Sequence, residues 1–125
     1  MNQWLAIAVG GAVGAVGRFW ISDLVDSGFG KNFPHGTLVV NVAGSLLMGI
    51  LYVLLVEKLT ADPIWRSFLM VGLLGAFTTF STFSLETLQL LEAGALLRAG
   101  LNVLVSVVSC VLAVWAGTFV GRHLI

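Results

Sequence analysis

Apolar residues gather along this chain in four long runs that short polar stretches separate. The runs cover about residues 4–21, 36–56, 64–91 and 95–120. Each reaches or exceeds the roughly 18 to 20 residues that a helix needs to cross a hydrocarbon layer about 30 Å thick. The runs lack the alternation of barrel strands, and only helices or closed barrels satisfy the backbone in lipid. The pattern therefore predicts an all-α integral membrane protein with four transmembrane helices in a single domain, residues 1–125.

The connectors between the runs are short and contain turn residues. The first, from Ser22 to His35, holds Gly28 and Gly30 as turn formers. The second covers residues 57–63 and ends in a proline suited to the first turn of a helix, and the third covers residues 92–94. We expect the first run to be a membrane helix and not a cleaved signal peptide, because no Lys or Arg precedes it.

Composition supports a lipid-facing exterior. Hydrophobic residues make up 58% of the chain and charged residues 10%, and the mean hydropathy is +1.04. Soluble domains contain about 25% charged residues, because they need polar surface. A formal net charge of zero without a basic run argues against nucleic-acid binding. The one cysteine, Cys110, excludes an internal disulfide and is interpreted as a packing residue.

Basic residues are nearly balanced across the predicted membrane. One side would hold Lys58, Arg66 and Arg122, and the other Lys31, Arg98 and, if it reaches the interface, Arg18. Small membrane proteins are normally oriented by a clear excess of Lys and Arg on one side. Either one or two residues set the orientation, or the chain inserts both ways and pairs with an inverted copy. We favour the second reading, since inverted symmetry builds many transporters.

Glycines indicate where helices touch and where one of them breaks. They recur as GGAVGAVG at residues 10–17 and at intervals in the other three runs. Small residues let helix backbones approach closely in lipid, which explains most of them. Gly75 differs, because TTFSTFS follows at residues 78–84 and Gly, Thr and Ser all weaken a helix. We expect the third helix to break in mid-membrane, with carbonyl oxygens left free there.

Polar residues inside the runs predict a lining. Five hydroxyls lie within TTFSTFS, Phe80 and Phe83 share one helical face, and Glu86 follows. Ser81, Thr82 and Ser84 either line a path or bond back to their own helix. Asn41 is either a partner in an interhelical hydrogen bond or a pore donor, and Ser106 and Ser109 are weaker candidates. Hydroxyls, an amide and positive ring edges suit a small anion, although the residues alone reach only a path for a small ion or solute.

At this point the chain resembles the Fluc family of fluoride channels, also called CrcB proteins. The resemblance is carried by the early glycines with Arg18, by GTLVVNVAGSLLMG at 36–49, and above all by GLLGAFTTFSTFSLE at 72–86. It covers essentially the whole chain.

The resemblance implies an antiparallel, dual-topology homodimer with two pathways that export fluoride passively through the cell membrane and exclude chloride. It implies a structural Na⁺ at the dimer centre, held by the backbone carbonyls of Gly75 and Thr78 of each subunit. The residues that would form the fluoride pathway are Asn41, Phe80, Phe83, Ser81, Thr82, Ser84, Glu86, Ser106, Ser109 and Arg18. Arg18 would either draw anions into a vestibule or serve structure. Ala76 stands where the family often has a second glycine.

Other classes of function fit the residues less well. A dual-topology, proton-coupled exporter of small cationic drugs needs a central carboxylate, and Glu86 lies off-centre while the other three runs lack an acid. A membrane scaffold would leave the polar block unexplained. An intramembrane hydrolase is disfavoured because His35 and His123 lie outside the predicted spans. We therefore expect no enzyme activity.

Overall fold

The computed structural model describes residues 2–59 and 62–125, and within these ranges every regular element is a helix. Helix α1 spans Gln3–Phe29, and α2 spans His35–Tyr52 and continues as the π-helix η1, Val53–Lys58. The third segment consists of α3 (Pro63–Trp65), the π-helix η2 (Arg66–Leu74), α4 (Gly75–Phe77) and α5 (Phe80–Glu92). The last helix, α6, spans Leu96–His123.

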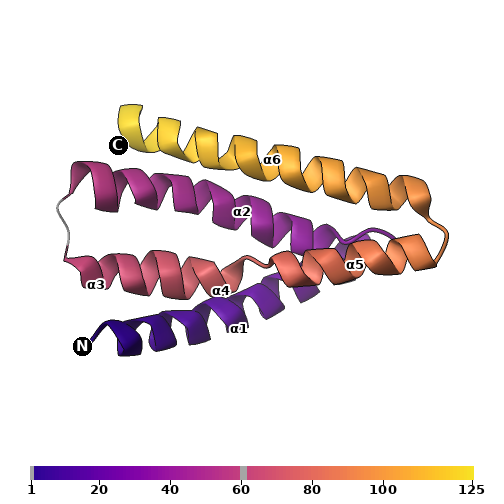
Figure 1. The fold of residues 1–125 in the computed structure, drawn as a ribbon, viewed down its shortest axis with the longest axis horizontal. Coiled ribbons are helices and arrows are strands. Elements are labelled where there is room, and N and C mark those ends of the chain that lie inside the picture. Colours follow the sequence, from indigo (N-terminus) through magenta and orange to yellow (C-terminus); the bar gives the residue numbers. More distant parts are fainter. Residues whose placement is uncertain (1, 60–61) are drawn as a thin grey trace.

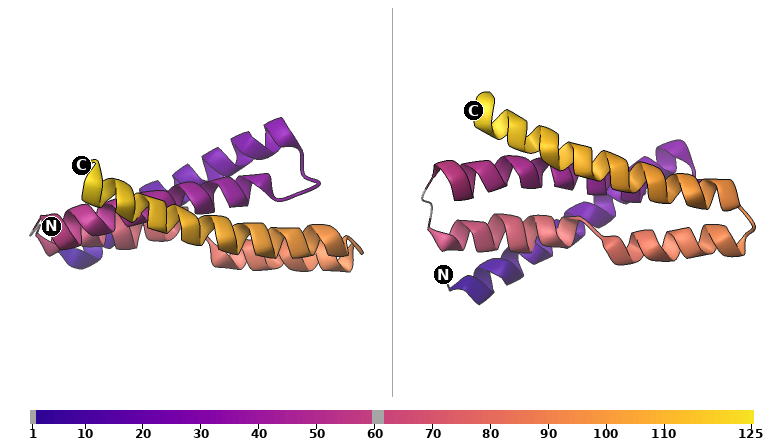
Figure 2. Two further views of the ribbon diagram at one scale, coloured as in Figure 1. Left: turned by 90° about the horizontal axis from the view of Figure 1, so that it is seen from above. Right: turned by 45° about the horizontal axis from the view of Figure 1, so that its top comes forward.

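Four segments of the described chain are long and apolar enough to cross a membrane. They are Gln3–Phe29, His35–Lys58, Pro63–Glu92 and Leu96–His123. The prediction of an all-helical protein with four spanning segments is confirmed. The segments form an elongated bundle with both termini at the same end (Figure 1). Helix α1 crosses the third segment at an angle, and α5 lies alongside α6 (Figures 1 and 2).

The first helix is longer than the sequence predicted. It begins with Asn2 as N-cap, whose Oδ1 accepts a hydrogen bond from the Leu5 N–H at 2.8 Å. It continues to Phe29 and ends only at Gly30, whose φ of 84° lies in the left-handed region that favours glycine. The prediction of a connector from Ser22 onward, with Gly28 as a turn former, is therefore wrong. Polar residues mark the end of an apolar run, but a helix can continue through them because its backbone hydrogen bonds are made internally.

The other two connectors begin later than predicted, because η1 continues to Lys58 and α5 to Glu92, and residues 60–61 of the predicted second connector lie outside the described residues. Their cap and turn residues have the predicted roles. Pro63 occupies the first turn of α3, and the Asp62 carboxylate caps this helix by accepting from the Ile64 N–H at 3.0 Å. Between α5 and α6 the chain turns at Gly94, whose φ is 78°. Both connectors thus use residues that the turn geometry requires.

Glycines set the distance between the helices. A Cβ atom on Gly14 would overlap the carbonyl oxygen of Leu73, so α1 lies directly on the backbone of η2. Gly49 and Gly117 act as a pair, because a Cβ atom on either would overlap backbone atoms of the opposite helix, α6 or α2. Close backbone approach of this kind is how helices associate where lipid supplies no hydrophobic driving force. The prediction that glycines mark helix contacts is confirmed along these two seams.

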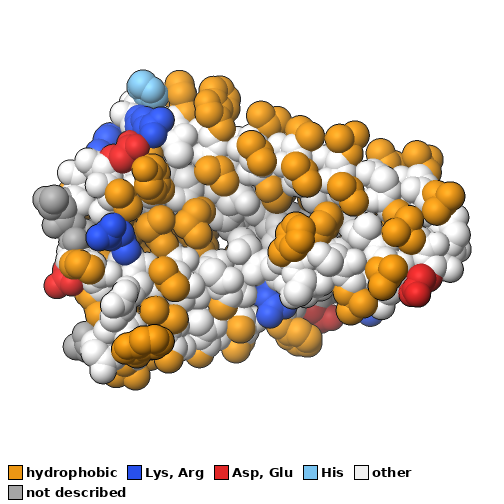
Figure 3. All heavy atoms as spheres, in the orientation of Figure 1, with side chains coloured by type: hydrophobic (Ala, Val, Ile, Leu, Met, Phe, Trp, Pro, Cys, Tyr) orange, Lys and Arg blue, Asp and Glu red, His pale blue; other side chains and the backbone are white. Residues whose placement is uncertain are grey.

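The exterior of the bundle is apolar. Hydrophobic side chains are spread over the whole face in Figure 3, and many charged side chains lie near the end that holds the termini. Trp4 is 84% exposed, and large aliphatic and aromatic side chains of every long helix are exposed as well. Such a surface is unsuited to water and suited to lipid or to a protein partner.

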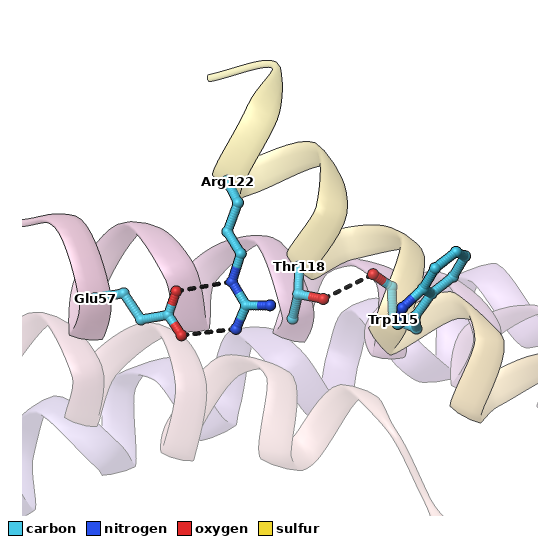
Figure 4. Close-up of polar contacts among 4 residues, drawn as sticks. All are labelled: Glu57, Trp115, Thr118 and Arg122. Atoms are coloured by element: carbon cyan, nitrogen blue, oxygen red, sulfur yellow. Dashed lines mark hydrogen bonds and ion pairs between the residues drawn. The ribbon is translucent and has the colours of Figure 1, made fainter.

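An ion pair joins α6 to η1 at the terminal end of the bundle (Figure 4). Arg122 donates from Nε and Nη2 to the two carboxylate oxygens of Glu57, at 2.9 and 2.8 Å. The Lys58 ammonium also donates to the Arg122 carbonyl oxygen at 3.3 Å. Both partners of the ion pair are substantially exposed, so solvent and salt screen it and its contribution to stability is small.

Candidate functional site

The backbone between α4 and α5 is extended at two residues. Thr78 has φ −91° and ψ 156°, and Thr79 has φ −151° and ψ 124°, both in the β region. Helix α4 ends at Phe77 and α5 begins at Phe80. The two helices are therefore separate hydrogen-bonded units within one spanning segment (Figure 1). Each has its own terminus at this point, and the groups at these termini need partners.

Asn41 of α2 pairs with the extended backbone. Its Oδ1 accepts from the Thr79 N–H at 2.8 Å, and its Nδ2 donates to the Thr79 carbonyl at 3.0 Å. This side-chain amide thus replaces both backbone partners that an uninterrupted helix would have supplied to Thr79. Of the two roles expected for Asn41, the structure shows the interhelical hydrogen bond, and Asn41 also borders the cavity described below.

Thr79 also starts the next helix. Its Oγ1 accepts from the Thr82 N–H at 3.2 Å, which makes it the N-cap of α5. The same hydroxyl lies 3.2 Å from Oγ1 of Thr82 and 3.4 Å from Oγ of Ser81. Three of the five hydroxyls of TTFSTFS are therefore engaged with one another at the start of α5.

Arg18 of α1 reaches the carboxyl-terminal end of α4. Its Nε donates to the carbonyl oxygen of Ala76 at 3.0 Å, in a partly buried contact between residues 58 positions apart. A cation near the last carbonyls of a helix also interacts favourably with the helix dipole. The structure thus places Arg18 in a structural contact with α4.

Two carbonyls at this point have the properties of cation ligands. Thr78 donates from its N–H and its Oγ1 to the Leu74 carbonyl, each at 3.0 Å. Within the described residues, neither the Gly75 nor the Thr78 carbonyl oxygen is an acceptor in these turn, cap and side-chain hydrogen bonds. Free carbonyls beside a half-helix end are the donor type that binds Na⁺ in membrane proteins, so the predicted ligands fit that ion.

Side-chain ligands for a metal are not grouped in the described chain. No cluster of three or more His, Cys, Asp or Glu residues is present in residues 2–59 and 62–125.

A cavity of about 380 Å³ opens beside the break. It lies between α2, the start of α5 and α6, and its lining residues include Asn41, Thr78, Phe80, Phe83 and Ser106. The Phe80 and Phe83 rings are tilted by 43°, with centroids 5.3 Å apart. Phe83 is buried, whereas Phe80 is 76% exposed on the single chain. The cavity thus has a polar corner at Asn41, aromatic walls and one open side.

Several predicted pathway residues lie outside this cavity. Ser81 and Ser84 are exposed, and Ser84 donates back to the Phe80 carbonyl at 2.8 Å. Ser109 likewise bonds to the Val105 carbonyl of its own helix. For Ser84 the structure shows the local hydrogen bond that the sequence left open as an alternative, and Ser109 makes the same kind of bond.

Glu86 borders a different cavity. This hollow of about 320 Å³ lies between the end of α1, the connector after it and α5, and Asp26 and Lys31 line it with Glu86. The Oε1 atom of Glu86 is buried and has no hydrogen-bond partner within the described part of the chain. Glu86 thus borders a different cavity from Phe80 and Phe83, although it lies one turn after Phe83 on α5.

A polar chain between α5 and α6 was not anticipated from the sequence. Ser106 donates to Oδ1 of Asn102 at 3.3 Å, and Asn102 donates from Nδ2 to Oγ1 of Thr87 at 2.9 Å. Thr87 in turn donates to the Phe83 carbonyl at 2.8 Å. Asn102 is almost fully buried. The signal was present, because Asn102 and Ser106 lie four residues apart in an otherwise apolar run and so share a helical face.

The comparison with known proteins agrees with the sequence motifs. Residues 5–118 match the family described as CrcB-like protein, Camphor Resistance (CrcB). A protein of Coxiella burnetii named fluoride-specific ion channel FluC is 49% identical over 121 residues, which cover 96% of this chain and 98% of that relative. A protein of the same name from Shewanella amazonensis is 55% identical over 117 residues, which cover 94% of both chains.

One relative is longer. A protein of Methylococcus capsulatus, also named fluoride-specific ion channel FluC, is 55% identical over 119 residues. The match covers 95% of this chain but 52% of that relative, so the chain spans about half its length. With four helices able to span a membrane, this chain is a multi-pass membrane protein. The family match over residues 5–118 covers most of the chain and includes Asn41, the extended Thr78–Thr79 stretch, Phe80 and Phe83. The chain therefore belongs to the CrcB-like family.

Proposed function

We propose that this protein is a channel that lets fluoride leave the cell passively. The observation that carries the proposal is the match to relatives named fluoride-specific ion channel over nearly the full length of this chain. Fluoride enters acidified cells as neutral HF and ionises in the more alkaline cytoplasm. A passive path then suffices for export, with no chemical step and no enzyme activity.

The cavity beside the break supports an anion path. One amide N–H of Asn41 is not engaged with Thr79, and Ser106 borders the cavity with a hydroxyl that would have to turn away from Asn102 to donate to an anion. Such neutral donors can replace hydration water without binding an anion as tightly as a cationic side chain. The edges of Phe80 and Phe83 carry partial positive charge and extend this environment along α5. The remaining lining is mostly apolar, with Met48 and three valines of α6, and Ser45, Thr78 and Thr79 add further polar groups.

The conducting form is an inverted homodimer with two pathways. Phe80 borders the cavity and yet is 76% exposed, and Gly75 beside the break is exposed as well. A second chain against this face would close the open side of the cavity. The near balance of Lys and Arg across the four spans supports insertion in both orientations. The exposed hydroxyls of Ser81 and Ser84 then belong to the paired surface.

The interruption of the third segment serves a central cation. In the proposed dimer it lies in mid-membrane, and the Gly75 and Thr78 carbonyls of both chains supply oxygen ligands for Na⁺. The ion would neutralise carbonyl ends that hydrocarbon cannot solvate. In this chain Asn41 and the Thr79 hydroxyl meet the needs of the backbone on the α5 side of the interruption.

The function is tested by ion efflux from proteoliposomes that contain the purified protein. We expect fast fluoride efflux, chloride efflux close to that of empty liposomes, and no requirement for a proton gradient. A proton-coupled exporter of cationic drugs would instead move its substrate only with a gradient and leave fluoride inside. Equal rates for fluoride and chloride, or no fluoride efflux, would refute the proposal.

The orientation of the chain in cells is a second test. A small tag at the carboxyl terminus should be labelled from both faces of the membrane in comparable amounts, because the charge balance does not select one orientation. Removing two positive charges from one side, with Arg66→Gln and Lys58→Gln together, should bias the labelling to one face. A wild-type tag accessible from one face only would exclude dual insertion.

The aromatic wall is tested by Phe83→Ile and Phe80→Ile, which keep an apolar side chain but remove the ring edge. We expect each to lower fluoride efflux by at least about tenfold, since a partial charge in the path is lost. Phe119→Ile, on the exposed side of α6, is the control and should conduct normally. The ring-edge contribution is rejected if both α5 variants conduct like the wild type.

The Asn41 amide is tested by Asn41→Asp. The carboxylate can still accept from the Thr79 N–H, but its second oxygen would face the Thr79 carbonyl in place of a donor. We expect loss of fluoride efflux and lower thermal stability, with a cost of about 1–3 kcal/mol for the unpaired buried carbonyl. Asn32→Asp, in the connector after α1, is the matched control. Normal efflux and stability of Asn41→Asp would contradict the role of the Asn41 amide in the fluoride path and in holding Thr79.

A further inference from the structure

Arg18 makes a contact whose position suggests a role beyond attraction of anions. Its Nε donates to the Ala76 carbonyl, one residue after Gly75 and two before Thr78. Within the described chain this is the only side-chain hydrogen bond from another element to the residues of α4. Helix α4 is the last turn of a helix that runs without a gap from Pro63 to Phe77, and the carbonyls of such a last turn have no partners within the helix.

The glycine seam brings Arg18 to this place. Gly10 and Gly14 lie against the backbone of η2, where a Cβ atom on either would overlap a carbonyl oxygen. One turn further, a Cβ atom on Gly17 would be 3.8 Å from the Phe77 ring, so α1 is still in contact with α4 there. Arg18 is the next residue. Its backbone is therefore fixed by close packing, and its side chain starts from a defined point.

We propose that Arg18 is a positioning residue that holds the carboxyl-terminal end of α4 and so fixes where the Gly75 and Thr78 carbonyls lie. The contact occupies the Ala76 carbonyl and leaves the Gly75 and Thr78 oxygens available. Asn41 holds Thr79 on the other side of the same carbonyls. The part of this inference that concerns Na⁺ rests on the proposed function. The part that concerns the backbone does not.

The chemistry of the contact separates positioning from simple charge. In lysine the atom equivalent to Nε is a methylene carbon, which cannot donate, although the positive charge is kept. In glutamine the amide nitrogen occupies the place of Nε, so a donor is kept while the charge is lost. Positioning through the Nε hydrogen bond therefore requires Arg18→Gln to resemble the wild type and Arg18→Lys to be defective. A role as an attractor of anions requires the reverse.

The backbone is examined by hydrogen exchange on the full-length protein in lipid nanodiscs, without Na⁺ and without fluoride. The amides to follow are those of Thr78 and Thr79, which donate to Leu74 and Asn41. We expect Arg18→Lys to speed their exchange at least about fivefold, as loss of a buried hydrogen bond does, and Arg18→Gln to change it less than about twofold. Arg98→Lys, at an exposed arginine in the first turn of α6, is the matched control and should leave both amides unchanged.

The sodium part is measured by thermal unfolding at increasing Na⁺ concentration, a readout independent of fluoride transport. The Na⁺ concentration for half-maximal stabilisation should rise about fivefold or more in Arg18→Lys and little in Arg18→Gln. Wild-type exchange in Arg18→Lys, or equal acceleration in both variants, would overturn the positioning role. If Na⁺ fails to stabilise the wild type, the inference that Arg18 positions carbonyl ligands for Na⁺ is overturned. Failure of fluoride efflux alone would refute the proposed function and leave the exchange result to decide the role of Arg18.

Discussion

Backbone groups at Thr78 and Thr79 leave the helical pattern within an apolar segment and need other partners, and this constraint governs the centre of the structure. At Thr79 both groups leave the helical pattern, and the Asn41 side chain takes both. At Ala76 a guanidinium takes the carbonyl. The interruption is therefore an assembly of three segments, α1, α2 and the α4–α5 junction. Its cost in free energy is offset only when all three are in place.

Close packing of glycine backbones makes this assembly possible. Gly14 lets α1 lie on η2, and Gly49 with Gly117 lets α2 lie on α6. These contacts bring Arg18 to α4 and set α2 and α6 as two walls of the cavity that Phe83 closes from α5. Short side chains along the seams and long ones at the site are thus two parts of one arrangement. In lipid, packing of this kind must replace the hydrophobic effect as the source of association.

A single chain has an unfinished inner surface. Phe80 faces outward although its ring borders the cavity, and exposed hydroxyls lie beside it on α5. Lipid accommodates exposed leucine and valine, but a row of hydroxyls next to a helix interruption calls for polar neighbours. The proposed inverted partner and its central cation would supply them, and they would do so for both chains through one symmetric contact.

The sequence alone determined the class of the protein, because four apolar runs of sufficient length have one physical solution in lipid. It also located the polar block, the glycine seams and the family. Local composition could not say which hydroxyls bond to their own helix, as Ser84 and Ser109 do, because both choices satisfy the same side chain. The apolar pattern ended the first helix at about residue 21, whereas α1 continues to Phe29. The pattern also gave no prediction of the hydrogen-bonded chain through Asn102. Only the tertiary structure decided that Asn41 and Arg18 hold the backbone beside Thr78. These contacts join residues 38 and 58 positions apart, and such separations are set by how helices cross and not by any local pattern.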